Sequence, residues 1–592
     1  MTSSSKLDLL LVQIATSYIH MDIRGQDPQL GQYYIAEYAT QAGYSVKIKR
    51  YSSNEPMIQG IYNILLEYNC DVLGFYIDSE NIWTIRRVIL ALKKLRSNLF
   101  VIIGGPQVTG NPELAMKRLA MSDCAIVGEG ERPITELLSV DFRVSENLMS
   151  IKGLVFSSNG KIVYTGPQTP VCNLDHYPFP RRELYTLDKE VIFDQISTGR
   201  GCIGKCAFCF EGSKKDNRLR LRSIKNVIEE IDYVVSNLKN HPFISFLDDT
   251  FIISPDRTEA ICRHLIEKYD GRIGWYCEAR VDILLRNLHL LPLMKRAGLI
   301  RIQLGGESGS QRVLDAYNKG MKIADLIYVV QKIYEEGISS AYINFIVGGA
   351  HETMESFMET LTLAKKLLNV APGCAEVGCS LFSPYVGTPM YDNPSLYGIK
   401  IIDRDLISGP DGYMAFVETA TLSQFQILQL KDYFDAEILN TQYEIIQTLS
   451  KEKLLHHFEL FDKYTMKTSV YNQLQKIESY KNYFEAVLKY GFSSIRNLSK
   501  EELMLAVPYR TVQPISDGQK YLRLVGKSDY KESTNLQNYI FLLSSGKLCF
   551  QEIVDILSRN EAFTNNDSLV DDIINAYNIF DDEHLVVWKH QF

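Results

Sequence analysis

The sequence lacks the features of a membrane or secreted protein. None of its apolar stretches approaches the ~20 residues that a membrane-spanning helix requires. Residues 1–6 carry no basic region followed by a long apolar one, so we predict no secretory signal. Hydrophobic residues make up 46% and charged residues 23% of the 592 residues, which is typical of a soluble protein. We therefore expect a cytoplasmic location.

The sequence also lacks an excess of positive charge. The chain has 63 Lys and Arg against 71 Asp and Glu, a formal net charge of −8. A general nucleic-acid binder needs a basic surface to offset phosphates, so nucleic acid is not an expected partner. One local exception is a basic strip made of Lys214, Lys215, Arg218, Arg220 and Arg222. Its pattern favours a solvated or phosphate-facing loop over a nucleic-acid site.

The cysteine pattern argues against a disulfide framework. Eleven Cys in a long chain with no predicted secretory signal indicate reduced thiols. The one tight group is Cys202, Cys206 and Cys209, with the spacing Cys-x3-Cys-x2-Cys. Thiolates bind iron–sulfur clusters, and a four-iron cluster held by three of them keeps one iron open for another ligand. Three ordinary core thiols are the alternative, but surrounding glycines indicate a tightly turning loop.

The first 150 residues predict a doubly wound, flavodoxin-like α/β domain. Apolar runs lie at 7–14, 45–50, 71–76, 99–103 and 124–127. Helical patterns lie between them at 29–42, 82–95 and 112–121. This alternation predicts a parallel sheet that binds ligands beyond the carboxyl ends of its strands. Gly104-Gly105-Pro106 and Gly128-Glu129-Gly130-Glu131 fall at two such ends, although tight turns alone explain these glycines equally well.

A second α/β domain is predicted at 185–395, after a connector at 151–184 that contains a hairpin and several prolines. Strands are predicted there at 191–197, 243–247, 272–277, 300–304, 341–347 and 376–382. Six parallel strands with outer helices predict a partial (β/α)6 barrel similar to a TIM barrel, with its chemistry at the carboxyl ends of the strands. Residues 396–592 predict a mainly α-helical region.

Polar residues follow the predicted barrel strands. Asp248-Asp249 ends the second strand. The two carboxylates are suited to general acid–base catalysis or to binding a divalent metal, and a substrate-facing loop is the other interpretation. Arg280 ends the third strand, and its guanidinium is suited to a carboxylate. Glu307 and Ser308 end the fourth within a glycine-rich stretch, where a plain turn with an N-capping Ser is the alternative.

These features resemble the radical S-adenosylmethionine (SAM) superfamily. Its signature is the same cysteine spacing with an aromatic residue, here Phe208, before the last Cys. The resemblance implies that Cys202, Cys206 and Cys209 hold a [4Fe-4S] cluster, that SAM chelates the open iron, and that a 5′-deoxyadenosyl radical forms. It implies SAM contacts for Arg280, Glu307 and Ser308. It also implies an external electron donor such as flavodoxin or ferredoxin.

The first domain resembles the cobalamin-binding domain that precedes many radical SAM cores. The resemblance implies cobalamin contacts for a set of strand-end residues: Gly104, Gly105, Thr109, Gly128, Glu129 and Gly130. The segment lacks the Asp-x-His-x-x-Gly motif, as cobalamin-dependent radical SAM enzymes commonly do, and His20 is its only His. The loop after the third strand contains Asp78 and Glu80, which are candidates to face cobalt. An N-cap role for Ser79 or Asn81 in this loop is the alternative.

Three functions fit this sequence. The first is a cobalamin-dependent radical SAM methyltransferase that acts on carbon or phosphorus of a natural-product intermediate or a peptide. The second keeps both cofactors but catalyses a rearrangement or cyclisation without methyl transfer. The third is an iron–sulfur or cobalamin sensor whose C-terminal module binds DNA or protein. Residues 520–592 resemble small winged-helix modules that recognise leader peptides; a lid or a dimerisation module is the alternative.

Overall fold

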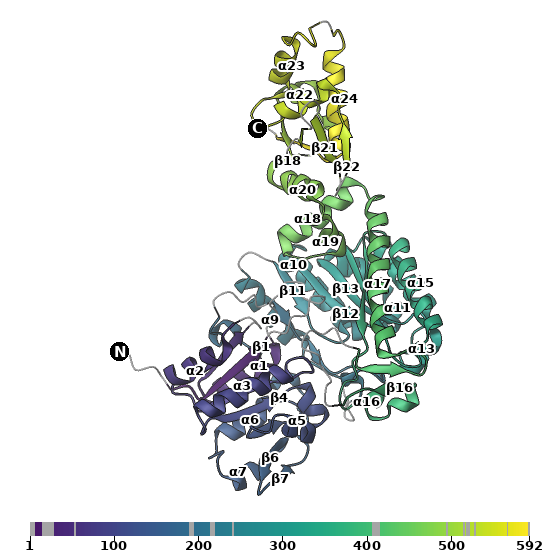
Figure 1. Cartoon of the computed structure of the whole chain (residues 1–592). Coiled ribbons are helices and arrows are strands. Elements are labelled where there is room, and N and C mark those ends of the chain that lie inside the picture. Colours follow the sequence, from purple (N-terminus) through teal and green to yellow (C-terminus); the bar gives the residue numbers. More distant parts are fainter. Residues whose placement is uncertain are drawn as a thin grey trace. The chain divides into compact units, whose positions relative to one another are not determined.

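The structure is a computed structural model of the chain (Figure 1). It describes residues 6–14, 29–51, 55–188, 194–213, 219–238, 242–404, 415–492, 495–512, 515–516, 521–525, 529–564 and 566–589. The chain divides into two compact units, Met1–Thr441 and Gln442–Phe592. Each unit has its own hydrophobic clusters, so each is described separately.

The first sheet of the larger unit is doubly wound, as predicted. Its order is β2-β1-β3-β4-β5-β6-β7, and the first five strands are parallel. These strands are β1 (Leu9–Ile14), β2 (Val46–Tyr51), β3 (Val72–Tyr76), β4 (Phe100–Gly104) and β5 (Cys124–Ile126). The predicted hairpin forms β6 (Leu154–Ser158) and β7 (Lys161–Tyr164) and extends this sheet through antiparallel pairing with β5.

Helices cover both faces of the first sheet. On one face α2 (Met57–Glu67) and α3 (Ile82–Leu95) contribute Ile61, Leu65, Ile85 and Ile89 to one apolar cluster. On the other, α1 (Leu30–Gln41) and α6 (Glu131–Leu138) contribute Tyr33, Ala36 and Leu137 to a second cluster. Because β1, β3, β4 and β5 are buried on both sides, these strands read as continuous apolar runs in the sequence.

The second sheet has the order β15-β14-β13-β12-β11-β8, and all its pairs are parallel. The strands are β8 (Gln195–Ile196), β11 (Phe243–Phe246), β12 (Gly274–Ala279), β13 (Leu299–Glu307), β14 (Ser340–Val347) and β15 (Ala375–Leu381). Intervening helices are α9 (Ile224–Asn237), α10 (Pro255–Tyr269), α11 (Val281–Arg286), α12 (Leu291–Arg296), α13 (Gln311–Ala316), α14 (Ile323–Glu335) and α15 (Met354–Val370). This order is that of the predicted partial barrel. Residues 191–193 of the first predicted strand lie outside the described residues.

Three arginines hold the strand that leads to the cysteine loop. Their guanidinium groups donate to backbone carbonyls at 2.6 Å (Arg182 to Gln195), 2.7 Å (Arg222 to Ser197) and 2.8 Å (Arg257 to Thr198). Glu230, fully buried, pairs with both Arg182 and Arg222. The prediction of a solvated or phosphate-facing basic strip is therefore wrong for Arg222, which is 4% exposed, and for Arg220, whose cation is ion-paired. Lys214, Lys215 and Arg218 lie outside the described residues.

The loop between β15 and α16 (Pro389–Asp392) touches both halves of the larger unit. A Cβ added to Gly110 of the first domain would lie 2.4 Å from the Val386 carbonyl oxygen, and one added to Gly387 would lie 3.0 Å from the Gly110 Cα. The backbones therefore meet with no room for a side chain between them. At the other end of this loop, the Met390 N–H donates to the Ala207 carbonyl oxygen at 3.2 Å.

The smaller unit is mainly helical, as predicted. Its helices include α18 (Lys451–Tyr464), α20 (Glu478–Tyr490), α22 (Asn535–Leu543), α23 (Phe550–Ser558) and α24 (Leu569–Asp582). Two antiparallel sheets accompany them. One consists of β18 (Gly491–Phe492), β23 (Val586–Lys589) and β19 (Val507–Arg510), in this order, so β23 lies at its centre. The other consists of β20 (Ile515–Ser516), β21 (Tyr521–Val525) and β22 (Asp529–Glu532), in this order. The winged-helix interpretation of this unit stays a prediction.

His584 makes the smaller unit sensitive to acid. Burial, reinforced by the Lys451 cation, lowers its pKa from 6.5 to about 3. Below pH 6.5 His584 becomes protonated in the unfolded chain but stays neutral in the folded unit. The free energy of unfolding therefore falls as the pH decreases toward 3. We expect a His584→Asn variant, which tolerates the φ of +57° at this position, to lose less stability between pH 7 and pH 5 than the unchanged protein. Thermal unfolding at each pH measures this difference, and His456→Asn, at a half-exposed site on α18, should match the unchanged protein.

Candidate functional site

The three cysteines lie on a tight loop between β9 (Gly199–Arg200) and α8 (Phe210–Ser213). Cys206 is buried, whereas Cys202 and Cys209 are partly exposed. The Gly204 N–H donates to the Cys202 sulfur at 3.3 Å, and the Thr250 hydroxyl lies 3.8 Å from the same atom. Two thiols of the loop are thus accessible, and the Cys202 sulfur has polar neighbours.

A neighbouring turn supports the cysteine loop from the protein side. The Ala207 N–H donates to the Tyr317 carbonyl oxygen at 2.9 Å, and Asn318 Nδ2 donates to the Lys205 carbonyl oxygen at 2.9 Å. The ring of Phe208 packs edge-on against the ring of Tyr317, with 5.0 Å between centroids. The aromatic residue that precedes the last Cys therefore anchors the loop.

The three thiols share one short loop, and thiolates are the usual ligands of iron–sulfur clusters. Within the described residues, no three His, Cys, Asp or Glu side chains form a group that could hold a single metal ion.

Arg280 lies between β12 and α11, beside the cysteine loop. Its Nη1 donates to the Cys206 sulfur at 3.5 Å, its Nη2 to the Lys319 carbonyl oxygen at 2.7 Å, and its Nε to Asp282 Oδ1 at 2.9 Å. A Cβ on Gly204 would lie 2.5 Å from Nη1, so the glycine admits the guanidinium. The Arg280 cation therefore lies directly beside the Cys206 sulfur. Its predicted contact with the SAM carboxylate stays a prediction.

Glu307 ends β13 and forms a buried ion pair with Lys319. The Lys319 Nζ lies 2.6 Å from Glu307 Oε1, and the two residues are 7% and 6% exposed. Burial lowers the pKa of Lys319, but the carboxylate of Glu307 outweighs it and the pKa is raised. A Cβ on Gly305 would lie 2.2 Å from Glu307 Oε1, so Gly305 makes room for the pair. We did not predict Lys319 as a site residue, although the Lys319-Gly320 pair marked its position.

Ser308 is fully buried, and its hydroxyl is directed toward α15. It lies 3.1 Å from the Thr360 hydroxyl and accepts from the Ser310 N–H at 3.1 Å. Thr360 also accepts from the Gly309 N–H at 2.9 Å. These contacts hold the turn that follows β13. The predicted contact of Ser308 with SAM stays a prediction.

The acidic pair after β11 has divided roles. Asp248 is buried and accepts from the N–H and the hydroxyl of Thr198 at 3.0 and 2.9 Å, whereas Asp249 is exposed. Burial raises the pKa of Asp248 to about 6, although the Thr198 hydrogen bonds oppose the rise. Asp248 therefore ties the strand before the cysteines to its neighbour. This arrangement disfavours a shared divalent-metal site.

A buried carboxyl closes the turn after β14. Glu352 is 1% exposed and accepts from the Gly348 N–H. Burial raises its pKa to about 7, against the hydrogen bonds from the backbone of Gly348 and Gly349. A Cβ on Gly349 would lie 1.6 Å from the Tyr317 hydroxyl. The turn is thus packed directly on the residue that supports the cysteine loop.

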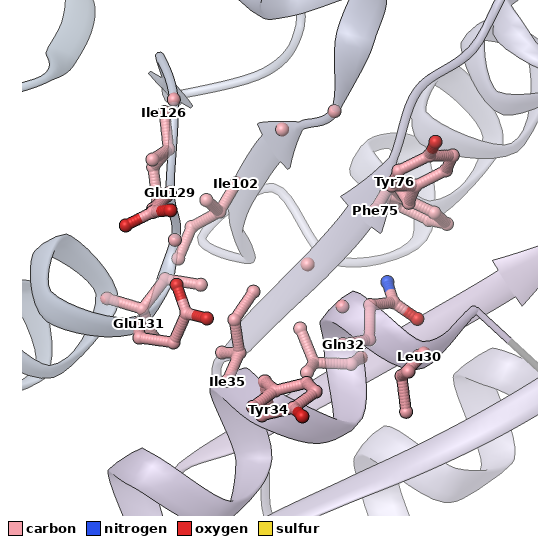
Figure 2. A pocket seen from close by; sticks show the side chains of 18 of the residues that line it. Leu30, Gln32, Tyr34, Ile35, Phe75, Tyr76, Ile102, Ile126, Glu129 and Glu131 are labelled. Carbon is pink, nitrogen blue, oxygen red and sulfur yellow. The ribbon is translucent and has the colours of Figure 1, made fainter. Parts of the chain in front are cut away.

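A cavity of about 500 Å³ lies at the carboxyl ends of the first sheet. Five of the six predicted cobalamin residues line it: Gly104, Gly105, Gly128, Glu129 and Gly130. The barrel side contributes Ser197, Arg200, Glu211 and Leu247. Figure 2 shows Glu129 and Glu131 on one side of the cavity and Tyr76 on the opposite side. The cavity therefore joins the predicted cobalamin loops to the segments that flank the cysteines.

Thr109 is the predicted cobalamin residue that does not line the cavity. Its hydroxyl oxygen accepts from the Gly128 N–H at 3.0 Å and so joins the two glycine loops. Asp78 accepts from the N–H groups of Glu80 and Asn81 at 2.9 and 2.8 Å, directly before α3. Asn81 is the N-cap residue of α3 and makes no side-chain capping bond. The position of Asp78 and Glu80 relative to cobalt stays a prediction. His20 lies outside the described residues.

Helix α1 supplies wall residues that we did not predict. Leu30, Gln32, Tyr34 and Ile35 line the cavity together with the strand-end glycines (Figure 2). Because α1 follows the carboxyl end of β1, the rule that identified Gly104 and Gly128 also applies to it. Its one glycine, Gly31, lies inside the helical pattern and not in a glycine turn, so it gave no strand-end signal.

Comparisons with known proteins agree with this geometry. The model of the B12 binding domain matches residues 21–138, and that of the radical SAM superfamily matches residues 196–364. An uncharacterized methyltransferase of Pyrococcus horikoshii is 30% identical over 392 residues, which are 65% of this chain and 82% of that protein. The chain belongs to the cobalamin-dependent radical SAM family.

Other relatives of this radical SAM protein differ in their named reactions. The anaerobic magnesium-protoporphyrin IX monomethyl ester cyclase of Rubrivivax gelatinosus is 27% identical over 58% of this chain and 63% of that enzyme. The solved structure of the radical SAM methyltransferase TsrM from Kitasatospora setae is similar with a TM-score of 0.57 and 14% identity, over 74% of this chain and 89% of that one. The latter likeness shows the shared fold.

Family membership confirms the three predicted cofactors: a [4Fe-4S] cluster, SAM and cobalamin. The residues of the site fit them. Three thiols beside a guanidinium suit a cluster, and a cavity walled by glycines admits a large planar ligand because no side chains fill its edge. In the part of the chain that the structure describes, no helix has the length and apolarity needed to span a bilayer.

Proposed function

We propose that this radical SAM enzyme is a methyltransferase that methylates carbon or phosphorus of a small-molecule or peptide substrate. When bound, the cluster with SAM supplies a hydrogen-abstracting radical and cobalamin supplies a methyl group. The observation that supports the proposal is the shared wall of the cavity. Gly104, Gly105 and Gly128 of the first domain line it together with Ser197 and Arg200, which lie just before the cysteines.

The protein's own residues would then perform three tasks. Cys202, Cys206 and Cys209 would hold the cluster, with the Arg280 cation beside Cys206. The Glu307–Lys319 pair would shape the carboxyl end of β13, where the SAM contacts are predicted. The cytoplasmic location and the external electron donor, flavodoxin or ferredoxin, belong to this proposal.

A rearrangement or cyclisation is the second candidate, because the Rubrivivax relative is named a cyclase. Loss of a methyl group from SAM leaves S-adenosylhomocysteine, whereas hydrogen abstraction leaves 5′-deoxyadenosine. The methyltransferase should form S-adenosylhomocysteine only when cobalamin is bound. An anaerobically purified enzyme that takes up cobalamin and forms 5′-deoxyadenosine alone would support the second candidate.

A glycine pair tests the cobalamin site. Gly105 (φ +104°) and Gly160 (φ +75°) both have positive φ, so alanine strains the backbone at either position. A Cβ on Gly105 would also lie 2.6 Å from the Ile77 carbonyl oxygen at the cavity wall, whereas Gly160 has nothing within 4 Å. We expect Gly105→Ala to reduce the cobalt content at least ~10-fold and to leave the iron content unchanged. The magnitude is taken by analogy with the loss of metal affinity when a residue that supports a metal site is mutated. Gly160→Ala should retain both, and equal cobalt in the two variants would contradict this site.

A further inference from the structure

An ionic cluster joins the cobalamin cavity to the cysteine loop. Arg200 lies two residues before Cys202, and its guanidinium is 3.0 Å from Glu129 Oε1 and 2.6 Å from Glu131 Oε1. Arg220 lies on β10 (Arg220–Leu221), opposite Arg200 of β9, and donates to Glu129 Oε1 at 2.6 Å. We call these two arginines and two glutamates the clamp. Its two positive and two negative charges balance.

The clamp is largely shielded from water. The exposed fractions of its side chains are 25% for Arg200, 17% for Arg220, 21% for Glu129 and 4% for Glu131. The Arg200 guanidinium also lies between two aromatic rings, 5.2 Å from the centroid of Tyr34 and 5.1 Å from that of Tyr177. Stacking and bidentate pairing both fix the orientation of a guanidinium, so Arg200 has little freedom to move.

Each end of the clamp stands on a rigid element. Glu131 is the first residue of α6, and Glu129 follows β5 in the glycine loop, where Gln168 Nε2 holds its carbonyl oxygen at 2.9 Å. Arg200 lies on the segment whose carbonyls accept from the buried Arg222 and Arg257. A shift of the cavity wall would therefore have to move the segment that carries the thiols.

Both ends also belong to the site. Arg200, Glu129, Glu131 and Tyr34 line the cavity, and the thiols begin two residues after Arg200. Although burial opposes it, pairing with Arg220 and Arg200 lowers the pKa of Glu129 and keeps it ionised. Reactions between held groups depend steeply on their separation, since a misplacement of about 1 Å costs on the order of 10²-fold in rate.

We propose that Arg200, Arg220, Glu129 and Glu131 are positioning residues that fix the separation between the cobalamin cavity and the cluster loop. The inference rests on the proposed function, because it requires both cofactors to be bound. It also changes the role of Glu129. This residue was predicted to contact cobalamin, and here its carboxylate is directed to the two arginines.

The test is the magnetic interaction between the reduced cluster and cob(II)alamin in the holoenzyme, which depends on their separation. Iron and cobalt contents are measured on each sample. We expect Arg200→Gln and Glu131→Gln each to weaken or broaden this interaction at least twofold while both metals are retained. The double variant should show no larger change than Arg200→Gln alone, because Arg200→Gln already removes the Arg200–Glu131 contact that Glu131→Gln removes. Arg263→Gln, which removes an exposed pair with Glu259 on α10, should match the unchanged enzyme.

An unchanged interaction in Arg200→Gln and Glu131→Gln, with both metals present, would overturn the clamp. So would additive effects in the double variant. If Arg200→Gln loses cobalamin, Tyr177→Leu replaces it, because Tyr177 stacks on Arg200 without lining the cavity; an unchanged interaction there also overturns the clamp. Absence of cobalt from the unchanged enzyme would instead overturn the proposed function and remove the basis of this inference.

Discussion

Replacing Cys206 with alanine is expected to remove the cluster and to reduce the formation of 5′-deoxyadenosine at least ~100-fold. Mutating even an outer-shell partner of a metal lowers metal affinity or activity about 10–100-fold, and Cys206 is a predicted direct ligand. Cys206 is the most buried of the three thiols, at 6% exposure, and receives the Arg280 hydrogen bond. Without its sulfur the loop would offer the cluster two ligands in place of three. Iron and sulfide assays together with chromatography of 5′-deoxyadenosine measure the effect.

A matched variant separates ligand loss from the general cost of removing a buried thiol. Cys262 is fully buried in α10 and lies outside the cysteine loop. Cys262→Ala should therefore retain the iron content and activity of the unchanged enzyme. A Cys206→Ala protein with full iron and undiminished 5′-deoxyadenosine would show that these thiols do not hold the reactive cluster.

Destabilisation by about 3–5 kcal/mol is expected when Lys319 is replaced by alanine, because a buried carboxylate loses its partner. Glu307 is held at φ +57° and 6% exposure, so its charge cannot turn outward to water. The chain has more than one unit, so the measurement is the midpoint of the first thermal transition. The double variant Lys319→Met with Glu307→Gln should recover most of the loss, since no unpaired charge remains.

The exposed pair of Lys332 and Glu335 on α14 provides the control. Their charged atoms lie 2.6 Å apart, close to the separation in the buried pair, but the side chains are 35% and 42% exposed. Water already solvates both charges, so Lys332→Ala should leave the transition unchanged. A midpoint for Lys319→Ala equal to that of Lys332→Ala would contradict the energetic importance of the buried pair.

The sequence predicted the strands and their carboxyl ends well, because buried parallel strands are continuous apolar runs bounded by glycine turns. Gly104, Gly128 and Arg280 were found in this way. The direction of a side chain at such an end was not predictable. Ser308 is bound by Thr360, which lies 52 positions away, and Glu129 by Arg220, which lies 91 positions away. Such partners are brought together by the packing of whole elements, which local periodicity does not report.

The basic strip is a second case in which local sequence did not predict the surroundings of a side chain, here of a charged one. A run of Lys and Arg is usually solvated, and nothing local to Arg222 indicates that Glu230 would neutralise it in the interior. The β6–β7 hairpin is a similar case. Its turn was evident from Asn159-Gly160, but the pairing of β6 with β5 depends on an exposed sheet edge that only the assembled domain presents.

The contact between Gly110 and Gly387 limits how the two domains of the larger unit can be recombined. Because the two backbones touch with no side chain between them, their shapes match at the level of the main chain. A hybrid enzyme that takes its first domain from a relative must take the loop at 386–387 from that relative too. We therefore expect the cobalamin domain and the barrel to be exchangeable only together with this loop.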